Sequence, residues 1–304
     1  MQKEVAQMNP SVSLTVPVRG LAYHVRTWGD AGDPKLFMLH GWMDVGASFQ
    51  FLVDALQRHW HVIAPDWRGF GLSQWSADGY WFADYLADLD ALLDHFAPKE
   101  PTRLVGHSLG GNVVMLYAGA RPQRVARVVS LEGFGIPAER PDLAAAKIAK
   151  WLDALRHPPS FRPYRNLAAV ADQLQKNNPR LARDKAEFLA AHWAQQQPDG
   201  SARLNSDPRH KLPFPTVYRM EEVFAIWRQI SAPVLWVAAT ESFIPQWLGA
   251  HPEGEAGTDT LEGIRARARH VPQGKLITID AAGHMLHLDR PDAVAAAMEP
   301  FLAS

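Results

Sequence analysis

Short apolar runs alternate with segments of helical periodicity over the first 135 residues of the chain. Apolar runs bounded by turn residues predict buried strands, and apolar residues repeated every three or four positions predict amphipathic helices. The expected strands are residues 13–18, 21–28, 35–40, 61–66, 103–107 and 124–133, and the expected helices are residues 48–57, 82–96 and 112–120. This alternation indicates an α/β fold in which helices cover both faces of a mostly parallel sheet.

The pattern changes in the middle of the chain. From Ile136 to Ile230 the sequence is helical or loop-like, a block of roughly 95 residues that is too long for an ordinary connection. The alternation then returns, with expected strands at residues 233–239 and 275–280 and an expected final helix at residues 292–302. We therefore predict a core domain of residues 1–135 and 232–304, with a helical lid of residues 136–231 inserted into it, called the cap below.

Composition narrows the class of protein only slightly. The chain has 304 residues and a net charge of −1, which gives no reason to expect a nucleic acid or an acidic membrane as a partner. It contains no cysteine, which excludes disulfides, thiolate metal ligands and a cysteine nucleophile. The first residues, MQKEVAQMNP, lack the apolar core of a secretory signal, and no apolar run of about 18 residues occurs. We therefore expect a cytoplasmic protein. Residues 251–259 (HPEGEAGTD) are expected to form an exposed loop.

The segment RLVGHSLGGNVV, residues 103–114, carries the strongest chemical signal. Gly106 to Gly110 match the pattern G-x-S-x-G and stand between an apolar strand and the start of a helix. Small neighbours permit a sharp strand-to-helix turn that presents a serine hydroxyl at a helix N-terminus, where a developing negative charge is stabilised. We interpret Ser108 as a nucleophile; the alternative is a glycine-rich structural turn.

A serine nucleophile requires a histidine base, which in turn requires an orienting carboxylate. On a strand–turn–helix scaffold of this kind the triad follows the order Ser, acid, His, so the base is expected after the last strand. The segment AAGHMLHLDRP follows that strand. His284 comes directly after a glycine, and we favour it over His287, three residues further on. His107, inside the turn, is interpreted as a packing residue or as a residue that supports the site residues, and not as the base.

Four segments resemble the signature blocks of the α/β-hydrolase superfamily. The resemblance spans nearly the whole chain outside the cap, in the family's order and rough spacing, and it implies an eight-stranded, mostly parallel sheet with a serine triad. It also implies an oxyanion hole formed by the amides of Trp42 and Leu109, as in small carboxylesterases. Asp66 and Arg68 match a block that is usually structural in the family. The four segments are LHGW (Leu39–Trp42), DWRGFGLS (Asp66–Ser73), GHSLGG (Gly106–Gly111) and GHMLHLDRP (Gly283–Pro291).

The acid of the triad has two candidates. Most members of the superfamily place it after the strand that follows the cap, in a block like G-x-x-D-x-x-x-P. Here that block reads AATESFIP, which lacks the glycine and the aspartate and puts Glu241 at the acid position. The haloalkane-dehalogenase branch uses the strand before the cap, where this chain has Glu132. A carboxylate at the end of a buried strand needs a partner such as an imidazole N–H, so we favour Glu132 and keep Glu241 as the alternative.

The cap is basic and lies over the expected site. Between Ile136 and Ser231 it carries 15 Lys and Arg against 10 Asp and Glu. A basic cap would favour acyl groups with a distal negative charge; the alternative is a solvated helical surface. One basic and aromatic cluster is expected to line the pocket entrance or to hold the cap on the core: His210, Lys211, Tyr218 and Arg219. The candidate pocket residues are His40, Gly41, His107, Phe134, Trp227 and Phe243.

The sequence therefore predicts a capped serine hydrolase that cleaves esters or thioesters of small to medium acyl groups through an acyl-enzyme. The expected triad is Ser108, His284 and Glu132. One alternative keeps this site but cleaves carbon–carbon or amide bonds, and another is a non-catalytic ligand receptor on the same fold. No HExxH, GxGxxG or P-loop motif occurs, so neither a metal nor a cofactor is expected. The expected partner is a small-molecule acyl ester or thioester.

Overall fold

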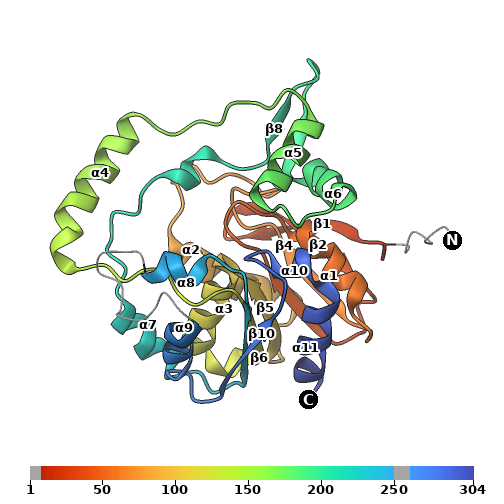
Figure 1. Ribbon diagram of the computed structural model, residues 1–304, viewed down its shortest axis with the longest axis vertical. Helices are drawn as coiled ribbons and strands as arrows, with labels where there is room; N and C mark the ends of the chain where they lie inside the picture. Colours follow the sequence, from red (N-terminus) through yellow and green to blue (C-terminus); the bar gives the residue numbers. More distant parts are fainter. Residues whose placement is uncertain (1–7, 250–260) are drawn as a thin grey trace.

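The computed structural model describes residues 8–249 and 261–304 (Figure 1). The loop expected at residues 251–259 lies outside these ranges. Eight strands form one sheet in the order β1-β2-β4-β3-β5-β6-β9-β10. They are β1 (Val12–Val18), β2 (Leu21–Trp28), β3 (Lys35–Leu39), β4 (His61–Pro65), β5 (Thr102–His107), β6 (Val125–Leu131), β9 (Val234–Ala239) and β10 (Gly274–Ile279).

The sheet is parallel except at one edge. β1 pairs with β2 and β2 pairs with β4 in antiparallel fashion, whereas every other neighbouring pair is parallel. The tight connection between β1 and β2 makes the predicted hairpin, and helical crossovers connect the parallel strands. The predicted α/β fold with a mostly parallel, eight-stranded sheet is confirmed.

Both faces of the sheet are buried, so the middle of its central strands is mostly apolar on both sides. Along β3, Leu36 and Met38 pack in one core cluster, while Phe37 and Leu39 pack in another on the opposite face. Helices α1 (Gln50–Ala55), α10 (Leu286–Asp289) and α11 (Pro291–Ala303) cover the first face. The second face is covered by α2 (Phe82–Phe96), α3 (Leu109–Ala120), α7 (Met220–Trp227), α8 (Ile244–Gly249) and α9 (Leu261–Ala268) (Figure 1).

The segment between β6 and β9 contains the whole of the predicted cap. In order, it forms α4 (Ala144–Arg156), α5 (Leu167–Asn177), α6 (Arg183–Trp193), β7 (Ala194–Gln196), β8 (Ala202–Leu204) and α7. Two 3₁₀ turns lie in this segment, at Pro141–Leu143 and Pro208–Lys211, and two lie before it, at Gly46–Phe49 and Pro122–Arg124. The antiparallel β7–β8 hairpin was not expected, because three-residue strands are too short to show a period of two. Among the helices described, none is long and apolar enough to cross a membrane.

The helices of the cap differ in how they are buried. None of the residues of α4 is buried, and in Figure 1 the helix lies away from α5 and α6. α5 and α6 pack on each other around a small apolar cluster that also contains Leu288 from α10. The last helix, α7, buries Met220, Val223 and Trp227 in the main core, beside α3. The last helix of the predicted cap, α7, therefore packs as part of the core domain.

His210 joins the cap to the core. Its ring is stacked between Phe70 and Tyr80, at centroid distances of 3.8 and 3.6 Å. Its Nε2 donates to the Arg68 carbonyl oxygen at 3.1 Å, and its Nδ1 accepts from the Tyr85 hydroxyl at 3.3 Å. Burial lowers the pKa of His210 to about 3. The ring is therefore neutral in the folded protein.

This buried imidazole makes folding stability dependent on pH. The unfolded chain binds a proton on His210 below about pH 6.5, whereas the folded chain does not do so until about pH 3. This group therefore costs no stability above pH 6.5, and the free energy of unfolding decreases as the pH is lowered below that value. At pH 5 the loss from this group is about 2 kcal/mol. We expect His210→Phe, which preserves the stack, to reduce the drop in unfolding free energy between about pH 7.5 and 5 by that amount.

Urea unfolding at the two pH values measures this drop for each protein. The substitution also removes the hydrogen bonds of His210, but that loss affects the variant equally at both pH values and does not change the drop. The matched control is His157→Asn at an exposed position, which should retain the wild-type pH dependence. An undiminished drop in His210→Phe would contradict the assignment.

Candidate active site

Ser108 lies in a sharp turn between β5 and α3. Its backbone has φ +52° and ψ −112°, a conformation that side chains rarely adopt and that is stored at functional sites. The turn brings the chain back against itself, so that a Cβ on Gly106 would lie 2.3 Å from the Gly110 carbonyl oxygen. Glycine is therefore required at position 106, as the G-x-S-x-G pattern suggested.

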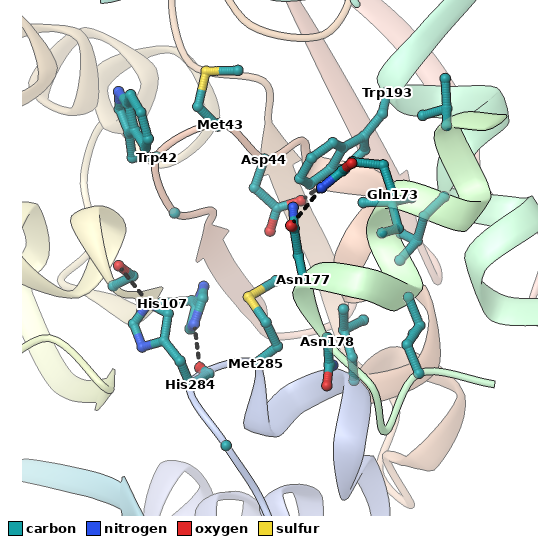
Figure 2. Close-up of a pocket in the computed structure, with 18 of the residues that line it drawn as sticks. Trp42, Met43, Asp44, His107, Gln173, Asn177, Asn178, Trp193, His284 and Met285 are labelled. Carbon is teal, nitrogen blue, oxygen red and sulfur yellow. Dashed lines mark hydrogen bonds between the residues drawn. The ribbon is translucent and has the colours of Figure 1, made fainter. Parts of the chain in front are cut away.

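The Ser108 hydroxyl lies against the ring of His284. The distance from His284 Nε2 to Ser108 Oγ is 3.0 Å, and His284 Nδ1 lies 3.3 Å from Glu132 Oε2 (His284 is labelled in Figure 2). The first distance is an ordinary hydrogen bond, and the second is longer than is typical of an N–H donor to a carboxylate. The structure thus brings together three side chains that lie far apart in the sequence.

Glu132 is held rigidly at the end of β6. Its side chain is buried, and its backbone has φ +57°, so it is a second strained residue beside Ser108. Oε1 accepts the Ala239 amide at 2.7 Å, and Oε2 accepts the Ser242 hydroxyl. These donors satisfy a buried carboxylate and orient it toward the imidazole. Sequence reasoning missed Ser242, because its link to Glu132 depends on how β6 and β9 are aligned.

The two competing residues lie elsewhere. The side chain of Glu241 is half exposed and forms an ion pair with Arg180 of the cap. His287 is fully buried in α10, where its ring is tilted against the ring of His107 at a centroid distance of 4.4 Å. Neither contacts the Ser108–His284 pair through a hydrogen bond.

The loop after β3 lies against the nucleophile. A Cβ on Gly41 would lie 3.2 Å from Ser108 Cβ, so the backbone that carries the Trp42 amide is adjacent to the serine. Leu109 is the first residue of α3, where helical amides have no partner within the helix. Neither amide is engaged by another backbone group of the described chain.

His40 supports this loop from inside and does not line the pocket, contrary to the prediction. Its Nδ1 donates to the Gly41 carbonyl oxygen at 2.7 Å, and its Nε2 accepts the Trp67 amide at 2.8 Å. Complete burial lowers its pKa to about 4, so the ring is neutral and holds the loop through these two contacts.

A cavity of about 570 Å³ opens beside Ser108 and His284. Three predicted residues line it, Gly41, His107 and Phe243, and so do Trp42 and Lys211. The cap provides most of the opposite wall, with three side-chain amides among apolar residues (Figure 2). The cap residues that line the cavity are Phe161, Tyr164, Val170, Gln173, Leu174, Asn177, Asn178, Pro179, Arg180, Leu181, Leu189, Trp193, Leu204 and Lys211.

Phe134 and Trp227 were also predicted to line the pocket, and the structure places them in the core. Both are fully buried, and each packs edge-on against Trp236 of β9, at centroid distances of 6.0 and 5.1 Å. The reason is that α7 folds back onto α3, which the sequence pattern did not indicate.

Asp44 is a buried carboxylate at the pocket that the sequence analysis did not single out. Its oxygens accept hydrogen bonds from the Val45 amide, the Ser48 hydroxyl and Nε1 of Trp193, which comes from the cap. The Trp193 contact, at 3.1 Å, ties the end of α6 to the core (Figure 2). Burial raises the pKa of Asp44 to about 7.

Asp66 and Arg68 have structural surroundings, in agreement with the reading of their block. Asp66 is buried and accepts the amides of Gly46 and Leu72, at 2.7 and 2.9 Å. Arg68 forms a two-pronged ion pair with buried Asp88, with both contacts at 2.5 Å. Both residues stabilise the loop after β4. Neither forms a hydrogen bond with Ser108.

Comparison with known proteins agrees with this geometry. The family model described as the alpha/beta hydrolase fold matches residues 34–291. A serine hydrolase-like protein of Danio rerio is 27% identical over 286 residues, covering 91% of this chain and 84% of that protein. A 3-hydroxybutyrate-oligomer hydrolase of Cupriavidus necator is 27% identical over 294 residues, covering 92% of each.

Among solved structures, a hypothetical protein from Pseudomonas aeruginosa PAO1 superposes with a TM-score of 0.82. It is 26% identical, and the match covers 96% of this chain and 99% of that one. The chain therefore belongs to the α/β-hydrolase family. The family match and the hydrolase relatives together support the conclusion that it is a hydrolase. The predicted resemblance to that superfamily is confirmed.

The turn at Ser108 should not tolerate a side chain at position 106. We expect Gly106→Ala to lower the free energy of unfolding by about 2–3 kcal/mol, because the new Cβ meets backbone that cannot move away cheaply. The matched control is Gly32→Ala, where a Cβ meets no atom within 4 Å. Thermal unfolding of the two variants checks this, and equal melting temperatures would contradict the described turn.

Proposed function

We propose that this protein is a serine hydrolase that cleaves carboxylic esters or thioesters of small to medium acyl groups. The single observation that carries the proposal is the continuous contact Ser108–His284–Glu132 at the edge of a cavity. A hydroxyl, an imidazole and a buried carboxylate in this order are the parts of a serine triad.

In the proposed reaction, His284 Nε2 takes the proton of the Ser108 hydroxyl while Oγ attacks the acyl carbon. The C–O or C–S bond then breaks, and His284 returns the proton to the leaving alcohol or thiol. Water, deprotonated by the same nitrogen, attacks the acyl-serine and releases the acid together with free Ser108. Glu132 stabilises the imidazolium that forms in each half-reaction.

We assign the oxyanion hole to the Trp42 and Leu109 amides. Support comes from the position of Gly41 against Ser108 and from the place of Leu109 at the start of α3. Donors that are fixed before the reaction stabilise the tetrahedral intermediate without reorganisation. The neutral ring of His40, which holds the Gly41 carbonyl, keeps the first of these donors in place.

The cavity supports an acyl group of limited size with mixed polarity. Its volume of about 570 Å³ lies in the range of small-molecule sites, and its wall combines apolar residues with the amides of Gln173, Asn177 and Asn178. Of its two cationic residues, Arg180 is already paired with Glu241 and Lys211 lies over the ring of Phe161. The similarity to a 3-hydroxybutyrate-oligomer hydrolase supports short hydroxyacyl esters as a substrate class to include.

Hydrolysis of p-nitrophenyl esters from C2 to C12, together with acyl thioesters, tests the function and the choice of acid. We expect Ser108→Ala to lower kcat/KM by at least about 10³-fold and Glu132→Gln by at least about 10²-fold. Glu241→Gln is the matched control, because it removes an equivalent carboxylate that pairs with Arg180, and it should stay within about threefold of wild type.

If Glu241→Gln were the crippled variant, the acid would be misassigned. Absence of turnover on every ester and thioester would contradict the proposal and favour the alternatives of a carbon–carbon or amide hydrolase or a non-catalytic receptor.

A covalent probe tests the nucleophile independently of substrate choice. A fluorophosphonate should add to Ser108 in the wild type and in Glu241→Gln, because the reaction needs only an activated hydroxyl. Intact-mass and peptide mass spectrometry would locate the adduct. Labelling that persists in Ser108→Ala at the wild-type rate would show that another residue reacts.

A further inference from the structure

Three buried side chains that the proposed reaction does not use meet beneath the pocket. Asp44 follows β3, His107 ends β5 and His287 lies in α10, and a ligand atom from each lies within 4.8 Å of the others. Their exposed fractions are 3%, 2% and 0%. The group is formed by residues far apart in the chain, so no sequence motif announced it.

One ring nitrogen of His107 has a free lone pair that could bind a metal ion. Its Nε2 lies 2.8 Å from the carbonyl oxygen of His284, and since a carbonyl only accepts, Nε2 carries the hydrogen. Nδ1 therefore presents a lone pair, and it has no hydrogen-bond partner among the described residues. Histidines that bind metals commonly donate their other N–H to a backbone carbonyl in this way, because the bond sets the tautomer and the ring orientation.

His287 lacks partners altogether within the part of the chain that the structure describes. Both ring nitrogens are buried without a hydrogen bond, and the ring packs between His107 and Phe49, at centroid distances of 4.4 and 5.4 Å. A buried polar group without a partner is destabilising, so native proteins seldom retain one unless a ligand or water satisfies it.

Asp44 provides the carboxylate of the group. The Val45 amide, Ser48 hydroxyl and Trp193 Nε1 hold its carboxylate, and Oδ2 accepts only the Ser48 hydroxyl among these, at 2.9 Å. These donors are all neutral, and hydrogen bonds of this kind orient a ligating carboxylate. Asp44 and His107 also line the cavity, so an ion can reach the group from the pocket (Figure 2).

We propose that Asp44, His107 and His287 form a binding site for a divalent transition-metal cation, with Zn²⁺ as the best match. Two imidazoles and one carboxylate suit zinc and similar ions, whereas Mg²⁺ and Ca²⁺ prefer sets of oxygen ligands. Three protein ligands leave a position for water or a pocket ligand. Because His107 also binds the His284 carbonyl, the ion would be one hydrogen bond from the backbone of the proposed base.

Calorimetric titration of the untagged, chelator-treated full chain with Zn²⁺ tests the site, and Co²⁺ provides a visible absorption spectrum that reports nitrogen ligation. We expect about one equivalent to bind, and Asp44→Asn and His287→Phe each to weaken binding at least about tenfold. Asn keeps the acceptor for Trp193, and Phe keeps the ring volume. His157→Asn, on the surface, is the control for adventitious histidine binding and should bind as wild type does.

Circular dichroism and melting of the metal-free variants establish that each is folded, and Zn²⁺ should raise the melting temperature of wild type more than that of either ligand variant. The proposal is overturned if wild type binds neither ion, if both ligand variants bind as tightly as wild type, or if only the surface control loses binding. None of these readouts depends on esterase activity, so the site and the proposed function stand or fall separately.

Discussion

The register of three neighbouring parallel strands determines whether this site exists. His107 of β5 pairs with Leu131 of β6, which pairs with Val237 of β9, so the three strands end at nearly the same level. The pairing continues just beyond the strand ends, where the Ser108 amide donates to Leu131 and the Glu132 amide donates to Val237, at 2.8 and 3.0 Å. A slip of one residue would turn these side chains to opposite faces of the sheet and separate the hydroxyl from the carboxylate.

Local sequence signals predicted the parts of the fold that depend on local physics. Alternating apolar strands and amphipathic helices gave the sheet, because burial on both faces leaves long apolar runs such as Leu36–Leu39. The turn at Ser108 was also predictable, since the glycines on both sides of the serine carry no side chain and so permit a sharp strand-to-helix turn. His284 could be chosen because a single loop joins the last strand to the last helices.

Contacts between distant segments could not be predicted in the same way. The preference for Glu132 over Glu241 rested on a resemblance, whereas the structure relates it to Ala239 and Ser242 across the β6–β9 pair. Phe134 and Trp227 looked like pocket walls because large aromatic residues suit either a wall or a core, and only the return of α7 onto α3 decides between them. Buried polar residues such as Asp44 carry no periodic signal at all.

The attachment of the cap has a consequence for its response to salt. Besides the stacked ring of His210, Asn178 donates to Asp289 at 2.6 Å, Lys185 donates to the Leu288 carbonyl at 3.0 Å, and Trp193 donates to Asp44. A hinge motion of α5 and α6 as one body would have to break these links together. The exposed Arg180–Glu241 pair also bridges cap and core at the rim of the cavity. Salt weakens an exposed ion pair of this kind, whereas it screens buried contacts much less, so the links between cap and core respond unequally to ionic strength.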